Sequence, residues 1–243
     1  QAYGGRAYAL QQKGALEAAL ADSNRAIELD PKYPPFFLNR GIVNADLGHL
    51  EKALADYDEA IRLCPSYITA YYDRGNAYSE QGSLEKALAD YNRALSLDPR
   101  FSSAYGGRAL VYAKMGDLTA AIRDYTRLIE LDPGSSKAYN NRGHDYLRHG
   151  NIDQALSDLN AAIRLDPKYA KAYVNRGLVR MEMDDPDAAI SDFSAAIALN
   201  PRDGTTYNLR GKAYQKKGVK AKAEADFADA LRLGYQSKKS GGG

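Results

Sequence analysis

Six prolines recur at an interval of 34 residues, and this interval limits the fold of the chain more than any other feature of its 243 residues. A period of roughly 20–50 residues is the sequence signature of a chain built from stacked copies of one module. Each copy buries its apolar surface against its neighbours, so the hydrophobic core extends along the stack instead of closing into one globule. The prolines are Pro31, Pro65, Pro99, Pro133, Pro167 and Pro201.

Each repeat contains two short segments with the periodicity of an α-helix. In the third repeat, Tyr71, Gly75 and Tyr78 follow one another at intervals of four and three residues, which places them on one helix face. Ala87 and Tyr91 are four residues apart in the second segment. A glycine suits the left-handed conformation at a helix end and separates the two segments in six repeats. These glycines are Gly14, Gly48, Gly82, Gly116, Gly150 and Gly218, while the sixth repeat has Asp184-Asp185-Pro186, with Asp185 expected as N-cap and Pro186 as the first helical residue.

This order of aromatic, glycine, tyrosine, alanine, tyrosine and proline residues resembles the tetratricopeptide repeat, a helix–turn–helix module of 34 residues. The resemblance covers residues 1–235 and implies an all-α fold, a right-handed superhelical solenoid of antiparallel helix pairs. It predicts a single array of seven repeats, followed by a flexible basic and glycine-rich tail at 236–243. The repeats are expected at about 1–33, 34–67, 68–101, 102–135, 136–169, 170–203 and 204–235.

Every repeat also carries an arginine and an aspartate in fixed places, whereas the family pattern has leucine in the arginine position. In the third repeat, Arg74 and Asp90 are 16 residues apart and border the apolar faces of their two helices. A charge in such a place is tolerated when an opposite charge pairs with it. We therefore predict structural ion pairs within or between adjacent repeats, in preference to an arginine ladder for phosphate or nucleic acid. The predicted pairs are Arg40–Asp56, Arg74–Asp90, Arg108–Asp124, Arg142–Asp158 and Arg176–Asp192, with Arg6–Asp22 and Arg210–Asp226 in the outermost repeats.

The opposite face of each first helix differs from repeat to repeat. In tetratricopeptide proteins this face lines a concave groove that binds an extended or helical peptide, so the resemblance implies that its residues bind a partner here. Asparagine suits this role, because one amide offers both a donor and an acceptor. Gly5, Gly107 and Leu209 interrupt the asparagine positions, which argues against one uniform peptide track. The predicted groove residues are Asn39, Tyr72, Asp73, Asn76, Lys137, Asn140, Asn141, His144, Lys171, Asn175, Asn208 and Lys212.

The chemistry of this face changes along the chain. The fifth to seventh repeats are richer in lysine and amide side chains than the second to fourth, which are mostly apolar. We therefore expect the last three repeats to bind an acidic peptide. Nucleic acid is not an expected partner, because the basic residues are few and are not interleaved with exposed aromatic residues.

These features favour a protein–protein interaction scaffold that binds a peptide or a partner helix in the concave groove. Two alternatives stay open. The array could self-associate by stacking through uncapped terminal repeats, because such ends expose apolar surface. It could also be an engineered scaffold, although the irregular variation between repeats argues against a pure consensus design.

The sequence shows no pattern that indicates catalysis. His144 and His149 are five residues apart, which does not place two metal ligands on one helix face, and Cys64 is the single cysteine. No phosphate-binding loop or dinucleotide fingerprint is present. We therefore predict no enzymatic activity, no catalytic residue, no cofactor and no bound metal.

Two further expectations concern the cellular setting. No membrane span is expected, because no apolar run reaches the about 20 residues that cross a bilayer. The chain begins at Gln1 without a methionine, so we expect that a segment precedes it. The compartment stays open, with the cytoplasm as the default.

Overall fold

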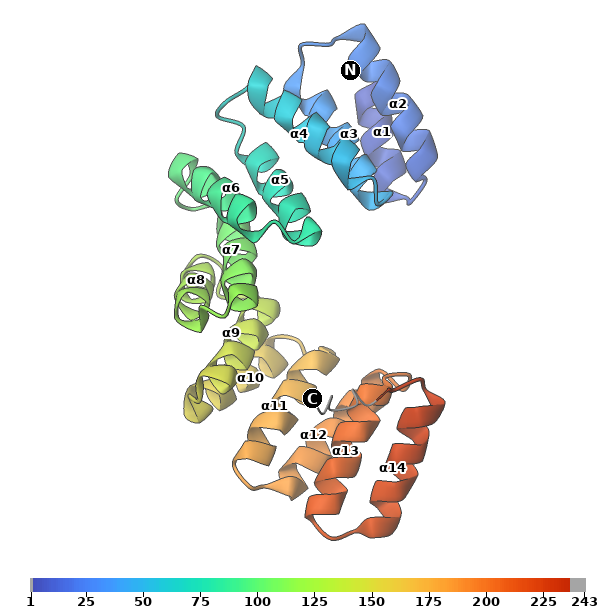
Figure 1. Ribbon diagram of the computed structural model, residues 1–243, viewed down its shortest axis with the longest axis vertical. Helices are drawn as coiled ribbons and strands as arrows, with labels where there is room; N and C mark the ends of the chain where they lie inside the picture. Colours follow the sequence, from blue (N-terminus) through green and yellow to red (C-terminus); the bar gives the residue numbers. More distant parts are fainter. Residues whose placement is uncertain (1, 237–243) are drawn as a thin grey trace, which may run out of the picture. The chain divides into compact units, whose positions relative to one another are not determined.

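The computed structural model describes residues 2–236, and this part of the chain forms α-helices joined by short turns, with no β-strand (Figure 1). Consecutive helices pack in pairs, so that the first and second helix of each repeat contact each other. The prediction of an all-α fold built from helix pairs is therefore confirmed.

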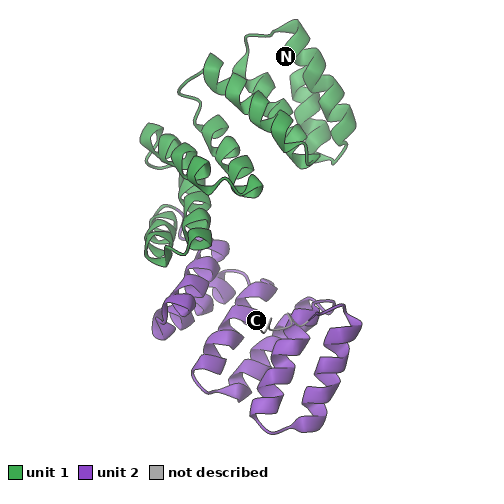
Figure 2. Ribbon diagram, viewed as in Figure 1, with its two compact units in different colours: residues 1–131 green, residues 132–243 purple. Residues whose placement is uncertain are grey.

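The chain falls into two compact units, residues 1–131 and residues 132–243, and each is described by itself (Figure 2). A single continuous array over 1–235, with the repeat boundaries given above, stays a prediction. The expected tail at 236–243 lies outside the described residues except for Gln236. The first unit contains α1 (Ala2–Gln12), α2 (Leu16–Leu29), α3 (Pro34–Asp46), α4 (Leu50–Leu63), α5 (Ile68–Gln81), α6 (Leu84–Leu97), α7 (Ser102–Met115) and α8 (Leu118–Leu131). The second unit contains α9 (Ser136–His149), α10 (Ile152–Leu165), α11 (Ala170–Glu182), α12 (Pro186–Leu199), α13 (Gly204–Lys216) and α14 (Lys220–Arg232).

The turn between the two helices of a repeat follows from residues that accept a positive φ. Gly82 ends α5 with a φ of 86°, a conformation that strains residues with a side chain. In the sixth repeat Asp184 has a φ of 59° in place of a glycine. The side chain of Asp185 then caps α12 by accepting a hydrogen bond from the backbone nitrogen of Ala188 at 3.0 Å, and Pro186 begins the helix. Asp185 and Pro186 thus start α12 as the sequence predicts.

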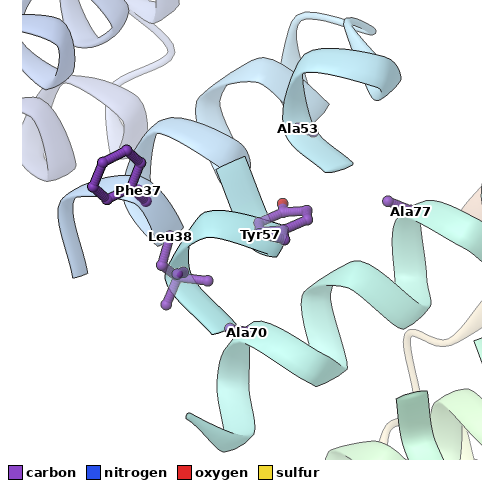
Figure 3. Packing of buried hydrophobic residues seen from close by; sticks show 7 residues of the cluster. Phe37, Leu38, Ala53, Tyr57, Ala70 and Ala77 are labelled. Carbon is purple, nitrogen blue, oxygen red and sulfur yellow. The ribbon is translucent and has the colours of Figure 1, made fainter. Parts of the chain in front are cut away.

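The core forms where small residues let two helices approach each other around one aromatic ring. Tyr57 of α4 is 2% exposed. A Cβ atom at Gly41 of α3 would lie 2.5 Å from this ring, so the ring fills the space that the glycine leaves. The cluster around Tyr57 draws on α3, α4 and α5, and it therefore joins one repeat to the next (Figure 3). Its buried members are Phe37, Leu38, Ala53, Tyr57, Ala60, Ala70 and Ala77.

The first helices of successive repeats also contact one another inside each unit. In the first unit α1 contacts α3, α3 contacts α5 and α5 contacts α7, and in the second unit α9 contacts α11. Side chains on these helices therefore lie next to side chains from the neighbouring repeat. We call the side of the first helices that carries the predicted groove residues the first-helix face.

Candidate functional site

Arg74 of α5 and Asp90 of α6 form an ion pair with two parallel hydrogen bonds. Nε of Arg74 donates to Oδ2 of Asp90 at 2.8 Å, and Nη2 donates to Oδ1 at 2.7 Å. The two side chains are 19% and 6% exposed, so the pair is largely removed from water. The structure brings arginine and aspartate together in every repeat, as Arg6–Asp22, Arg40–Asp56, Arg74–Asp90, Arg108–Asp124, Arg142–Asp158, Arg176–Asp192 and Arg210–Asp226.

The remaining nitrogen of the guanidinium reaches the preceding repeat. Nη1 of Arg74 donates to Oδ1 of Asp58 in α4 at 2.5 Å. Nη1 of Arg108 donates to Oδ1 of Asn92 in α6 at 2.6 Å. One arginine therefore joins its own two helices to the second helix of the repeat before it. The corresponding acceptors elsewhere are Asn24 for Arg40, Asn160 for Arg176 and Ser194 for Arg210.

Aromatic rings of the first helix surround the same guanidinium. Cζ of Arg74 lies 5.6 Å from the centroid of the Tyr71 ring and 5.9 Å from that of Tyr78. The hydrogen bond to Asp90 is the largest cause that raises the pKa of Arg74, and the bond to Asp58 adds to it, although burial acts in the opposite direction. All three nitrogens of Arg74 donate inside the protein, which leaves this side chain poorly suited to bind a phosphate group.

On the first-helix face of α5, Tyr72 and Asn76 contact aromatic residues that lie outside this helix. The Tyr72 ring centroid lies 5.3 Å from that of Phe101 in an edge arrangement and 6.0 Å from that of Tyr91. The hydroxyl of Tyr91 donates to Oδ1 of Asn76 at 2.7 Å. The structure thus brings Tyr72 and Asn76 into one polar and aromatic cluster next to Asp73.

Asp73 is half-buried, and no hydrogen bond or ion pair links its carboxylate to another described residue. Burial raises the pKa of Asp73 to about 6. A cationic group placed beside it would compensate the lost contact with water and favour the ionised form.

Asn39 holds the same place in the preceding repeat and lines a small cavity of about 80 Å³ together with Tyr8 and Ile42.

In the second unit, several amides predicted for the groove bond to other side chains of the chain. Nδ2 of Asn175 in α11 donates to Oδ1 of Asn140 in α9 at 2.9 Å. Nδ2 of Asn140 contacts Oδ1 of Asn141 at 3.1 Å. Nδ2 of Asn208 donates to the hydroxyl of Tyr235 at 3.1 Å. The bonds of Asn175 and Asn208 hold separate segments together, a role that the sequence reasoning did not foresee.

The predicted lysines of the second unit are available to solvent. Lys137, Lys171 and Lys212 are exposed, and no ion pair links their ammonium groups to another described residue. Lys137 and Lys171 hold the same place in α9 and α11, 34 residues apart. His144 is half-buried, with Nδ1 at 3.6 Å from Oδ1 of Asp145. The first helices of this unit therefore present accessible positive charge.

Residues 2–236 hold no group of three or more histidine, cysteine, aspartate or glutamate side chains placed to bind a metal ion. Within the same range, no helix combines the length and the apolar character required to cross a bilayer.

Family models match the chain along most of its length. A model described as TPR repeat matches residues 7–48, 45–82, 75–116 and 143–184. Models described as tetratricopeptide repeat match residues 102–135, 124–157 and 170–203. The chain belongs to the tetratricopeptide repeat family. The resemblance predicted from the sequence is confirmed by these matches.

Solved structures agree with a tetratricopeptide solenoid. A tetratricopeptide repeat protein from Parabacteroides merdae is 26% identical with a TM-score of 0.75, and the match covers 97% of this chain and 93% of that one. YrrB, described as a TPR protein with an unusual peptide-binding site, is 26% identical with a TM-score of 0.63, covering 81% of this chain and 97% of its own. MamA is 29% identical with a TM-score of 0.61, covering 68% and 91%. None of the curated proteins compared with the chain matches it. The predicted fold class is confirmed.

Proposed function

We propose that this tetratricopeptide array is a scaffold that binds a partner polypeptide along its first-helix face. The peptide-binding site described for the solved relative YrrB supports this function. The face has two sections, one in each compact unit. The first section comprises Asn39, Tyr72, Asp73 and Asn76, and the second comprises Lys137, Asn140, Asn141, His144, Lys171, Asn175, Asn208 and Lys212.

The proposal rests on a difference between two sets of charged side chains: those present in every repeat, and those that occur on the first-helix face of individual repeats. The arginine and aspartate present in every repeat bind each other, as Arg74 and Asp90 do. The charged groups predicted for the first-helix face, such as Asp73 and Lys171, make no ion pair with a described residue. Charges held without an internal partner are available to an external one.

The first section favours a basic or aromatic side chain of the partner. Asp73 offers a half-buried carboxylate without a partner among the described residues. Tyr72 precedes Asp73 in the chain, and its ring packs against that of Phe101 in an edge arrangement. A lysine or arginine of the partner would pair with Asp73 and pack its alkyl stem on these rings.

The second section favours an acidic segment of the partner. Lys137 and Lys171 lie at the same position of successive first helices, and Lys212 lies on the next one. Exposed ion pairs contribute about 0.2–1 kcal/mol each, so three lysines give a modest affinity that weakens as salt screens the charges.

The test is a fluorescence anisotropy titration with a labelled ten-residue peptide of glutamate and aspartate. The double variant Lys171→Glu plus Lys212→Glu should weaken binding about tenfold, because two attractive contacts become repulsive. The matched control is Lys168→Glu plus Lys220→Glu, which changes the net charge equally at exposed positions outside the first-helix face. Equal losses in the two double variants would show that net charge alone attracts the peptide and would contradict the proposed site.

A second candidate function, self-association through terminal repeats, rests on exposed apolar side chains. Leu231 of α14 is 68% exposed and Leu29 of α2 is 59% exposed. Tyr3, Leu29 and Tyr33 line a cavity of about 150 Å³ in the first repeat. We expect light scattering to show dimers or larger species. The substitution Leu29→Glu or Leu231→Glu should dissociate them into monomers. A monodisperse monomer at high protein concentration would argue against it.

A further inference from the structure

A cavity of about 330 Å³ lies where α2, α3 and α4 meet, within the first compact unit. Its lining includes the exposed residues Asn24, Lys52 and Ala55 and the buried residues Asn44 and Asp56. None of the residues around it belongs to the proposed first-helix face. The full lining is Leu20, Asn24, Arg40, Asn44, Lys52, Ala55 and Asp56.

The cavity corresponds to a place that a tyrosine side chain occupies in other repeats. Asn44 is the residue of the second repeat at this position, and Tyr78 is its counterpart 34 residues later. The same position holds Tyr112, Tyr146 and Tyr214 in three other repeats. The second repeat therefore has the surroundings of a tyrosine ring without the ring.

Two cations flank the ring where the tyrosine is present. Cζ of Arg74 lies 5.9 Å and Nζ of Lys86 lies 5.3 Å from the centroid of the Tyr78 ring. The residues in the same places of the second repeat are Arg40 and Lys52, and both line the cavity. A cation over the face of an aromatic ring is attracted by the ring's negative potential. The second repeat thus keeps both cations of this arrangement.

Asn44 adds a hydrogen-bond acceptor that the chain leaves unused. Its Nδ2 donates to Oδ2 of Asp56 at 2.9 Å. Because a carboxylate only accepts hydrogen bonds, this contact fixes the amide with its nitrogen towards Asp56. Asn44 is 3% exposed, and its Oδ1 is buried and accepts no hydrogen bond from a described residue. A buried acceptor without a donor is unfavourable, so a ligand with a hydroxyl group would improve this site.

We propose that this cavity binds a phenolic ring, which inserts between Arg40 and Lys52 and donates a hydrogen bond from its hydroxyl to Asn44. The volume is sufficient, because an apolar protein cavity of about 150 Å³ already holds benzene. The ring comes either from a tyrosine of a partner polypeptide or from a small phenol in solution, and both present the same chemistry. The site is separate from the proposed peptide-binding face and does not depend on it.

The first experiment uses the full chain and two small probes, 4-methylphenol and toluene, followed by NMR chemical shifts. We expect 4-methylphenol to bind with a Kd on the order of 1 mM and to shift the side-chain amide signal of Asn44. Toluene lacks the hydroxyl and should bind about tenfold more weakly. The variant Asn44→Tyr supplies the ring from the chain itself and should abolish binding of both probes. Equal affinity of the original chain and of Asn44→Tyr for 4-methylphenol, or no binding of 4-methylphenol, would overturn the proposal.

The equivalent position in the third repeat provides a gain-of-function control. Tyr78→Asn should create a second site between Arg74 and Lys86, so that 4-methylphenol binds two sites per chain. In the double variant Asn44→Tyr plus Tyr78→Asn, binding should persist at the third repeat alone. N-acetyl-tyrosinamide then distinguishes the sources, because its binding shows that a tyrosine of a polypeptide can enter. Binding of 4-methylphenol without N-acetyl-tyrosinamide would assign the site to small phenols. If Tyr78→Asn folds and gains no binding, the cation pair does not make a phenol site and the proposal fails.

Discussion

Arg108 and Asp124 face each other across the fourth repeat with two hydrogen bonds, Nε to Oδ2 at 2.6 Å and Nη2 to Oδ1 at 2.9 Å. The carboxylate side chain is 2% exposed and that of the arginine 17%. Removing one partner of such a pair leaves a buried charge without compensation. We expect Arg108→Ala to lower the free energy of unfolding by about 3–5 kcal/mol, measured by urea denaturation.

The matched control is Arg127→Ala. The ion pair of Arg127 with Glu130 is exposed, so its loss should lower the free energy of unfolding by less than about 1 kcal/mol. A loss below about 1 kcal/mol in Arg108→Ala would mean that water screens the pair.

The third hydrogen bond of Arg108 couples one repeat to the next. Its Nη1 donates to Oδ1 of Asn92 at 2.6 Å, and Asn92 belongs to the preceding repeat. Asn92→Ala should lower the free energy of unfolding by about 1–3 kcal/mol, because the acceptor binds a charged donor. In a double-mutant cycle with Arg108→Ala the two losses should add up to more than the loss in the double variant. Strictly additive losses would show that this contact is not energetically coupled.

Two glycines inside first helices, Gly75 and Gly5, differ in whether the surrounding structure leaves room for a side chain. A Cβ atom at Gly75 would lie 2.9 Å from the Tyr91 ring, so Gly75→Ala should destabilise the protein by about 1–3 kcal/mol. A Cβ atom at Gly5, also inside a first helix, would have no other atom within 4 Å. Gly5→Ala should therefore be neutral or stabilise by up to about 1 kcal/mol through helix propensity. Thermal unfolding of both variants checks the contrast, and equal effects would contradict it.

We expect the stability of the protein to depend on pH through Asp73. Burial raises the pKa of Asp73 in the folded state to about 6, above the ordinary value of 3.8. The folded state therefore binds more protons than the unfolded state between pH 4 and 6, and the free energy of unfolding falls as pH rises through this window. Asp73→Asn should remove this decrease and stabilise the protein at pH 7.5 by about 1–3 kcal/mol, with little effect at pH 4.

Urea denaturation at several pH values measures this effect. Glu85→Gln, at an exposed position of the same repeat, is the control, and its profile should keep the decrease that Asp73→Asn removes. An Asp73→Asn profile that matches the original chain would show that Asp73 ionises normally.

Much of the architecture follows from the sequence because each repeat must use the same contacts. The 34-residue period, the helix pairs and the pairing of Arg74 with Asp90 all follow from spacing within one repeat. The hydrogen bond from Arg74 to Asp58 depends on how two repeats pack, which spacing inside one repeat does not determine. The sequence does contain a pattern that indicates this contact. In the second to seventh repeats, a polar side chain that can accept a hydrogen bond lies 16 residues before each arginine.

The candidate site was less predictable because side chains on the same face also interact with each other. The sequence placed Asn140 and Asn175 in the groove on the basis of their position. The structure joins them by a hydrogen bond, since first helices of neighbouring repeats lie side by side. Their role in binding a partner stays a prediction. The cavity beside Asn44 also had a sequence signal, the replacement of a tyrosine that four other repeats carry.

The measurement that tests the account most directly is a charge-swap titration on the second unit. The acidic ten-residue peptide and its all-lysine counterpart are titrated against the original chain and against Lys171→Glu plus Lys212→Glu. We predict that the original chain prefers the acidic peptide, and that the double variant loses about tenfold in affinity for it while gaining affinity for the lysine peptide. Unchanged affinity of both peptides for the double variant would show that the first-helix face of this unit does not bind them.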